Sequence, residues 1–214
     1  MSESNNKNLG IQVIPSPHTN SVVELLKCIR TRPLMYIGDK RISSMRSFLD
    51  GFRYALSLNH IKEEDIIPFW YFHEFVSRHY SWGESTAGWC DIILEENKND
   101  EEKSLDVFFE LFEQFADIKI LSTRDIKLND RHIAFHDSEE CQTKRITDIQ
   151  KWEKGPLYTN PTDVSLLELS NGWFIYYVVD EEKKDWEKTI FKDEETAIKD
   201  IEKLFGNLNL IDHE

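Results

Sequence analysis

The side chains with the most evident potential for chemistry are His132, His136 and Cys141, which follow one another at spacings of four and five residues. Imidazole nitrogens and thiolates are zinc ligands, but a closed zinc site needs a fourth ligand, usually from a Cys-x-x-Cys pair. The sequence contains no such pair. The pattern therefore favours surface histidines over a metal site. A metal-assisted hydrolase that uses His132, His136 and a carboxylate is the alternative function.

Other catalytic patterns are missing from the sequence. There is no Gly-x-Ser-x-Gly motif, which would present a serine nucleophile on a sharp turn. Carboxylates are abundant, but they lie among other charges, where nothing raises a pKa toward that of a general acid. We therefore expect a protein that is not an enzyme and that uses no cofactor or metal.

The segment RPLMYIGD at residues 32–39 resembles the RPGMYIGD segment of the ATPase subunits of type II topoisomerases and gyrase. That family also has a glutamate base and a metal-holding asparagine on the next helix, and then an Asp-x-Gly-x-Gly segment. Here the following stretch, SMRSFLDGFRYALSLNH, contains no glutamate, and no Asp-x-Gly-x-Gly occurs. We therefore expect no ATP hydrolysis, and the shared residues predict only a break and a turn before a helix.

Two predicted helices flank this segment. Ser21 and Glu24 have the spacing of a capping box, which predicts a helix start, and Pro33 predicts its end near residue 31. Gly38 can adopt the positive φ of a turn, and Asp39 is placed to cap the next helix. The apolar stripe of that helix has steps of three and four residues. It consists of Ile42, Met45, Leu49, Phe52 and Leu56.

Three further segments up to residue 116 have a helical pattern. An aromatic-rich helix is predicted from about Pro68, a second helix from Ser85 or Thr86, and a third after Asp100. The third has an apolar face that we expect to point inward. Its members are Leu105, Phe108, Phe109, Phe112 and Phe115.

The pattern changes at residue 117. IKIL and HIAF predict short strands, and Asn171-Gly172 between two apolar runs predicts a hairpin with a type I′ turn. KDWEKTIF predicts a third strand, and DEETAIKDIEKLFG predicts a capped helix ended by Gly206. The last helix has Ala197, Ile198, Ile201, Leu204 and Phe205 on one face.

Together these patterns predict an α+β fold. We expect a flexible N-terminal arm at 1–20, a bundle of about five helices at 21–116 and a connection with short strands at 117–157. Residues 158–214 should form a small antiparallel sheet with one covering C-terminal helix.

Composition limits the partners and the compartment. The chain has 214 residues and a net charge of −14, which disfavours direct binding to nucleic acid or to an anionic membrane. The three cysteines are widely spaced, the first residues are polar, and no apolar run approaches the length of a membrane span. We expect a cytoplasmic protein.

The negative charge is concentrated in two blocks. Residues 1–60 have a net charge of +4, residues 61–116 of −10, residues 117–157 of zero and residues 158–214 of −8. Runs of charge are usually solvated faces, but carboxylates beside Trp also suit a surface that attracts a basic protein. The tryptophans that could serve as anchors are Trp82, Trp89, Trp152, Trp173 and Trp186. The candidate partner-binding residues are Glu95, Glu96, Glu101, Glu102, Glu110, Glu113, Asp180, Glu181, Glu182, Asp185, Trp186 and Glu187.

Residues 21–116 resemble a group of small bacterial immunity proteins encoded beside polymorphic toxins. The shared pattern is an RPxMYxG segment, an apolar-striped helix, a helix that contains Gly-Trp and a DEE…FF helix. The matching residues are Arg32, Pro33, Met35, Tyr36, Gly38, Phe48, Leu49, Gly51, Phe52, Gly88, Trp89, Phe108, Phe109 and Leu111.

This resemblance implies a cytoplasmic inhibitor that binds the toxin domain of a contact-dependent growth inhibition or related system. The acidic composition favours a basic nuclease as the cognate toxin, and an RNase of the EndoU kind is our preferred target. An α+β adaptor with another partner is a further alternative.

Overall fold

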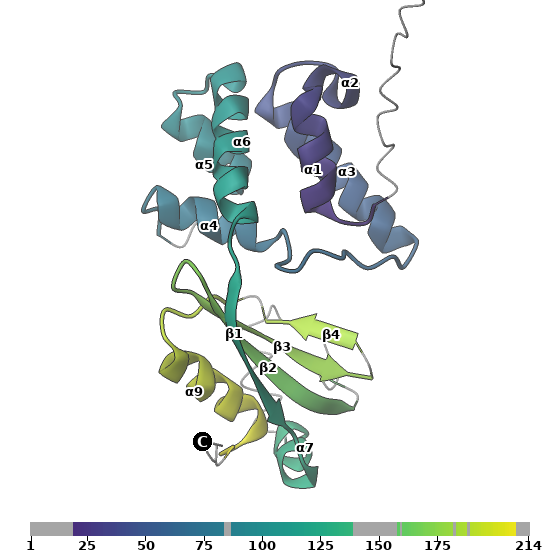
Figure 1. Ribbon diagram of the computed structural model, residues 1–214, viewed down its shortest axis with the longest axis vertical. Helices are drawn as coiled ribbons and strands as arrows, with labels where there is room; N and C mark the ends of the chain where they lie inside the picture. Colours follow the sequence, from purple (N-terminus) through teal and green to yellow (C-terminus); the bar gives the residue numbers. More distant parts are fainter. Residues whose placement is uncertain are drawn as a thin grey trace, which may run out of the picture. The chain divides into compact units, whose positions relative to one another are not determined.

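The computed structural model describes residues 19–83, 87–138, 158, 160–181, 183–187 and 189–208, and it forms two compact units, Met1–Ala116 and Asp117–Glu214 (Figure 1). The helices of the first, helical unit are α1 (Val22–Thr31), α2 (Pro33–Ile37), α3 (Ile42–Leu58), α4 (Tyr71–His79), α5 (Trp89–Glu96) and α6 (Glu101–Ala116). The second unit contains β1 (Ile120–Lys127), α7 (Asp130–His136), β2 (Pro161–Leu169), β3 (Phe174–Asp180), β4 (Lys183–Trp186) and α9 (Glu194–Phe205).

The fold is α+β, as the sequence predicted. In the described part of the chain, every helix is too short or too polar to cross a membrane. Most of the predicted N-terminal arm, residues 1–18, lies outside the described residues, as does the segment 139–157 with Cys141 and Trp152.

Ser21 caps α1 as predicted, because its Oγ accepts a hydrogen bond from the Glu24 amide at 3.0 Å. The Glu24 carboxylate forms an ion pair with Lys27 at 2.7 Å. A second carboxylate, that of Asp65 before α4, accepts a hydrogen bond from the Val22 amide at 2.8 Å. The start of α1 is thus fixed partly by a residue distant in sequence.

The break after α1 is followed by a short helix. Pro33 occupies the first position of α2, where its missing N–H costs nothing, and Gly38 ends α2 with a φ of 79°. The prediction that Asp39 caps α3 was wrong. The Ser43 amide, in the first turn of α3, has no partner within the helix and donates instead to Glu101 Oε2 at 3.1 Å. Packing brings the start of α6 beside the start of α3.

Aromatic rings fill the core of the helical unit. The Phe72 ring centroid on α4 lies 5.5 Å from that of Phe108, 5.6 Å from that of Phe115 and 5.8 Å from that of Trp89. The predicted inward face of α6 is confirmed, since Leu105, Phe108, Phe109, Phe112 and Phe115 are all buried. On α3 the predicted stripe is buried at Ile42, Met45 and Leu49 and half-buried at Phe52 and Leu56.

The start of α5 differs from the prediction. Ser85 and Thr86 lie outside the described residues, but α5 begins after them, at Trp89, with Gly88 at the N-cap position. Gly is tolerated there because it readily adopts the extended backbone that the N-cap requires.

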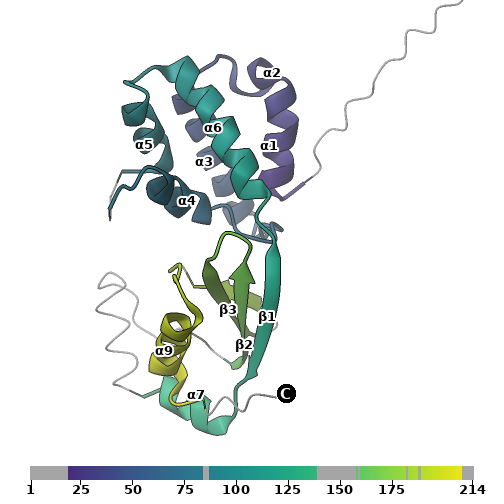
Figure 2. The same cartoon turned by 60° about the vertical axis from the view of Figure 1, so that its left-hand side comes forward.

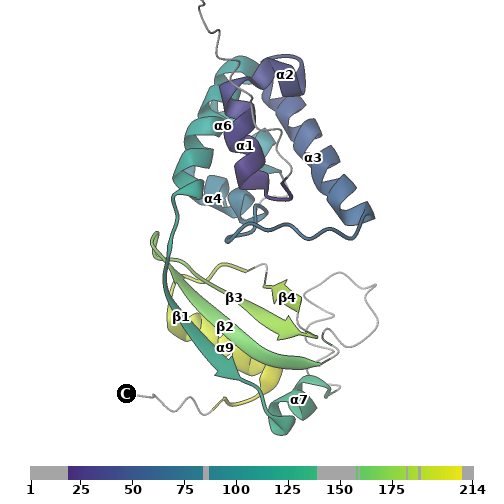
Figure 3. The ribbon, with the colours of Figure 1, turned by 45° about the vertical axis from the view of Figure 1, so that its right-hand side comes forward.

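The sheet of the second unit has four antiparallel strands in the order β1-β2-β3-β4 (Figure 3). Val164 of β2 and Tyr176 of β3 face a core that also contains Phe205 of α9, and α9 covers this face of the sheet (Figure 2). The predicted α9 face is confirmed: Ala197, Ile201, Leu204 and Phe205 are buried and Ile198 is half-buried. The strand predicted at the start of 117–157 is present as β1, which extends beyond IKIL to Lys127 and pairs along its length with β2.

Two local predictions in this unit were also wrong. HIAF is part of α7 rather than a strand, because Asn129 caps the helix and His132 and His136, one turn apart, both face inward. The hairpin lies at Asn171-Gly172, but only Gly172 has a positive φ. The Gly172 amide donates to Leu169, whose own amide donates to Trp173. This pattern is a type I turn followed by a glycine bulge.

Candidate functional site

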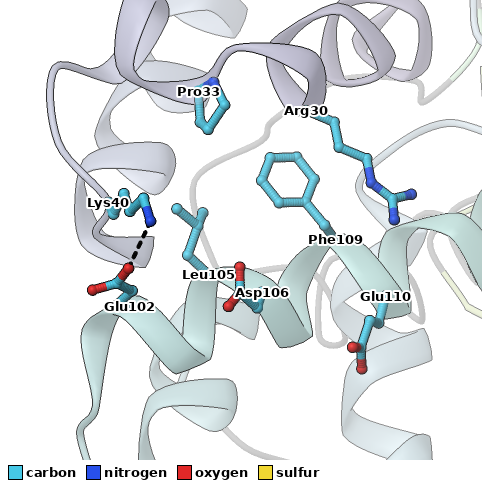
Figure 4. Close-up of a pocket in the computed structure, with 8 residues that line it drawn as sticks. All are labelled: Arg30, Pro33, Lys40, Glu102, Leu105, Asp106, Phe109 and Glu110. Carbon is cyan, nitrogen blue, oxygen red and sulfur yellow. Dashed lines mark hydrogen bonds and ion pairs between the residues drawn. The ribbon is translucent and has the colours of Figure 1, made fainter.

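A pocket of about 340 Å³ opens on the helical unit (Figure 4). Arg30 of α1, Pro33 of α2 and Lys40 of the α2–α3 connection form one side of it. The other side belongs to α6 and consists of Glu102, Leu105, Asp106, Phe109 and Glu110. All lining residues belong to one compact unit. The pocket is therefore a feature of the helical unit itself.

Local sequence explains how α6 lines the pocket. Side chains three and four residues apart share one face of a helix, so Glu102, Asp106 and Glu110 form one row and Leu105 and Phe109 form the adjacent row. Leu105 and Phe109 are 3% and 6% exposed and point from α6 toward Pro33 (Figure 4). The pocket thus has an apolar floor and a row of carboxylates along one side.

The two basic residues of the pocket are already paired. Lys40 Nζ lies 2.8 Å from Glu102 Oε1, and this hydrogen bond raises the pKa of Lys40. Arg30 forms an ion pair with Glu113 on the next turn of α6. In the described part of the chain, the carboxylates of Asp106 and Glu110 have neither an ion pair nor a hydrogen bond. Two carboxylates without an ion pair or a hydrogen bond therefore remain in the pocket, and the charge of Asp106 is close enough to Lys40 to help raise the pKa of Lys40.

The predicted acidic block on α5 and α6 is mostly occupied by internal contacts. Glu101 pairs with Arg41 at 3.1 Å, Glu102 pairs with Lys40, and Glu113 pairs with Arg30. Glu96 accepts a hydrogen bond from Trp82 Nε1 at 2.7 Å. All the predicted residues of this block except Glu101 are nevertheless exposed, so the block is a solvated face whose charges are partly paired with the positively charged N-terminal segment. Glu95 and Glu110 are exposed and have no partner within the described residues.

The second predicted block lies in the other compact unit, around the β3–β4 turn. Asp180 ends β3, Glu181 is exposed in the turn with a φ of 48°, and Asp185 lies on β4. Glu182 lies outside the described residues. Of the other predicted residues, Trp186 and Glu187 contact β3. Trp186 packs edge-to-face on Tyr177 with centroids 4.7 Å apart, and the Glu187 amide donates to the Tyr176 carbonyl at 2.9 Å.

The two histidines are not surface residues, so that prediction was wrong. His132 is 6% exposed and its Nδ1 accepts a hydrogen bond from the Asn129 amide at 3.3 Å. His136 is 1% exposed, and its ring packs 5.2 Å from that of Tyr158 and 5.4 Å from that of Phe205. Both imidazoles build the α7–α9 core. Within the described residues no group of three or more His, Cys, Asp or Glu side chains could hold a metal ion.

The anchoring role predicted for tryptophan is compatible with its burial. Trp70, Trp82, Trp89, Trp173 and Trp186 are all half-buried. Sequence reasoning missed Asp106, which completes the pocket. The signal that could have found it is the spacing of Glu102, Asp106 and Glu110, which places the three carboxylates one above another on α6.

Comparison with known proteins adds no relative. No family model matches the chain, and neither the curated proteins nor the solved structures contain a significant match.

Proposed function

We propose that this chain is a protein inhibitor, the immunity protein of a bacterial toxin system, and that its partner is a basic toxin domain. The observation that carries the proposal is the pocket on the helical unit, with its apolar floor and the unpaired carboxylates of Asp106 and Glu110. A site of this kind suits a ligand group that has a cationic head and an apolar stem. It lies on a protein whose net charge is −14.

Exposed apolar residues beside the pocket support a protein partner. No residue of α2 is buried, and Leu34 and Met35, which follow the pocket residue Pro33, are 55% and 68% exposed. Interfaces combine apolar anchors at the centre with charged residues at the rim. The α2 surface and the α6 carboxylates together have this composition.

Electrostatics favours a nuclease among toxin domains. A nuclease needs Lys and Arg side chains to hold the phosphates of its substrate, so its surface attracts an acidic inhibitor and accelerates the encounter. An inhibitor that covers those cations would compete with the nucleic acid. We therefore propose that the chain binds and neutralises a nuclease domain and does not itself catalyse a reaction.

The test is co-expression with the product of the adjacent upstream gene. We expect a stable complex, loss of that protein's nuclease activity in the complex, and an association rate that falls as salt is added. An upstream product that lacks toxin activity, or that forms no complex even at low ionic strength, would contradict the proposal.

A further inference from the structure

We infer that the pocket between α1–α2 and α6 is the receptor for a single arginine side chain presented by the protein partner. This inference rests on the proposed function and specifies how the partner is recognised. Its basis is the combination of an apolar floor, two unpaired carboxylates and a size suited to one side chain.

The charge of the pocket favours a cation. Lys40 and Arg30 are each paired with a carboxylate of α6. The charge that remains in the pocket is therefore that of Asp106 and Glu110. These two carboxylates lie one helical turn apart on the same face, about 5–6 Å between Cβ atoms. A guanidinium carries five N–H donors in a planar fork and can donate to both carboxylates once the Glu110 side chain, which points away from Pro33 in Figure 4, turns toward the pocket.

The shape of the pocket favours a long side chain with an apolar stem. Leu105 and Phe109 are nearly buried and form the floor. The methylene stem of an arginine packs on apolar surface while its head stays near charge, and its flat guanidinium can stack on an aromatic ring. The pocket volume of about 340 Å³ is at the lower end of ligand pockets, which range over roughly 300–1,000 Å³. This space accommodates one long side chain.

The rim of the pocket favours an apolar residue next to the partner's arginine. Leu34 and Met35 are exposed directly after the pocket residue Pro33. An apolar residue beside the partner's arginine would cover them and exclude water from the rim, which strengthens the charge contacts. The recognised element is thus an arginine flanked by an apolar side chain.

The pocket can be tested on the full-length protein without knowledge of the partner. The probes are arginine amide and its uncharged isostere citrulline amide, at millimolar concentrations, followed by amide chemical shifts in nuclear magnetic resonance spectra. We expect arginine amide to produce saturable shifts around Phe109 and Asp106, and citrulline amide to produce none there. Equal shifts from both probes, or arginine shifts confined to other surfaces, would overturn the inference.

Matched variants separate the pocket from overall charge. Asp106→Asn with Glu110→Gln removes both carboxylates with little change in shape, and we expect arginine amide to bind at least about tenfold more weakly. Asp50→Asn with Glu64→Gln makes the same change in net charge at exposed residues outside the pocket, and binding should be retained. The same loss in both double variants would refute a specific pocket. The two single pocket variants give the same comparison if the double variant is less stable.

The two proposals can fail independently. If the upstream gene product binds and is inhibited but the pocket variants bind it as well as the wild type does, the arginine receptor is wrong and the inhibitor function stands. If arginine amide binds the pocket but no toxin partner is found, the inhibitor function is wrong. Leucine amide that matches arginine amide at the pocket would show an apolar site and overturn the arginine assignment.

Discussion

Glu101→Ala is the substitution that most directly tests how the helical unit is held together. The Glu101 carboxylate accepts a hydrogen bond from the Ser43 amide at 3.1 Å, which caps α3, and it pairs with Arg41 at 3.1 Å. Its side chain is 27% exposed. Loss of a capping carboxylate costs about 0.5–2 kcal/mol, and a largely exposed ion pair contributes at most about 1 kcal/mol. We expect a loss of about 1–2 kcal/mol in the free energy of unfolding.

Glu102→Ala is the matched control. Glu102 is the neighbouring residue in the same first turn of α6, so both substitutions remove a carboxylate from the same helix dipole. Its ion pair with Lys40 is more than half exposed on both sides and caps no helix. Urea unfolding followed by the helical circular dichroism signal should show a clearly smaller loss for this variant. Equal losses for the two variants would refute the capping role of Glu101.

The effect of Glu101 should also depend on pH. Burial alone would raise the pKa of Glu101, but the hydrogen bonds from Ser43 and Arg41 outweigh burial and hold this pKa below its ordinary value of 4.5. A carboxylate with a lowered folded-state pKa contributes stability above its unfolded pKa and loses that contribution as the pH falls through its folded pKa. The difference between wild type and Glu101→Ala should therefore shrink below pH 4.5. A difference that stays constant into acid would exclude the ionised cap.

Burial and backbone geometry give three further expected outcomes. Burial raises the pKa of the Cys90 thiol to about 12. An alkylating reagent should therefore modify half-buried Cys28 first and Cys90 only after denaturant is added. Rapid modification of Cys90 in the native protein would contradict its burial. Phe108→Ala should lower the free energy of unfolding by about 3–5 kcal/mol in urea titration, since it opens a cavity where four rings meet. Gly172→Ala should lower the free energy of unfolding by about 1–2 kcal/mol, because Gly172 has a positive φ. Gly51 lies in open space on α3, so Gly51→Ala should raise the free energy of unfolding by about 0.5–1 kcal/mol. A change of the same sign for both substitutions would show that φ does not decide the outcome.

Much of the local structure could be read from the sequence because its causes are local. The apolar stripes of α3, α6 and α9 predict both the helix and its buried face, since residues three and four apart share a face. Ser21 and Asp193 mark helix starts because their own side chains reach the following amides. The position of the hairpin follows from Gly172, although the type of turn does not.

The sequence by itself determined most of the helices with their buried faces, the position of the hairpin and the uneven distribution of charge, because these depend on neighbours within a few residues. Only the tertiary structure decided which charges meet. Packing of α3 against α6 brings Lys40 to Glu102 and Glu101 to Ser43, contacts about 60 residues apart in the chain. Most carboxylates of the acidic block are paired in this way, whereas Asp106 and Glu110 stay unpaired beside the apolar floor of the pocket. The candidate site therefore arises from what packing leaves uncompensated, which no local pattern in the sequence encodes.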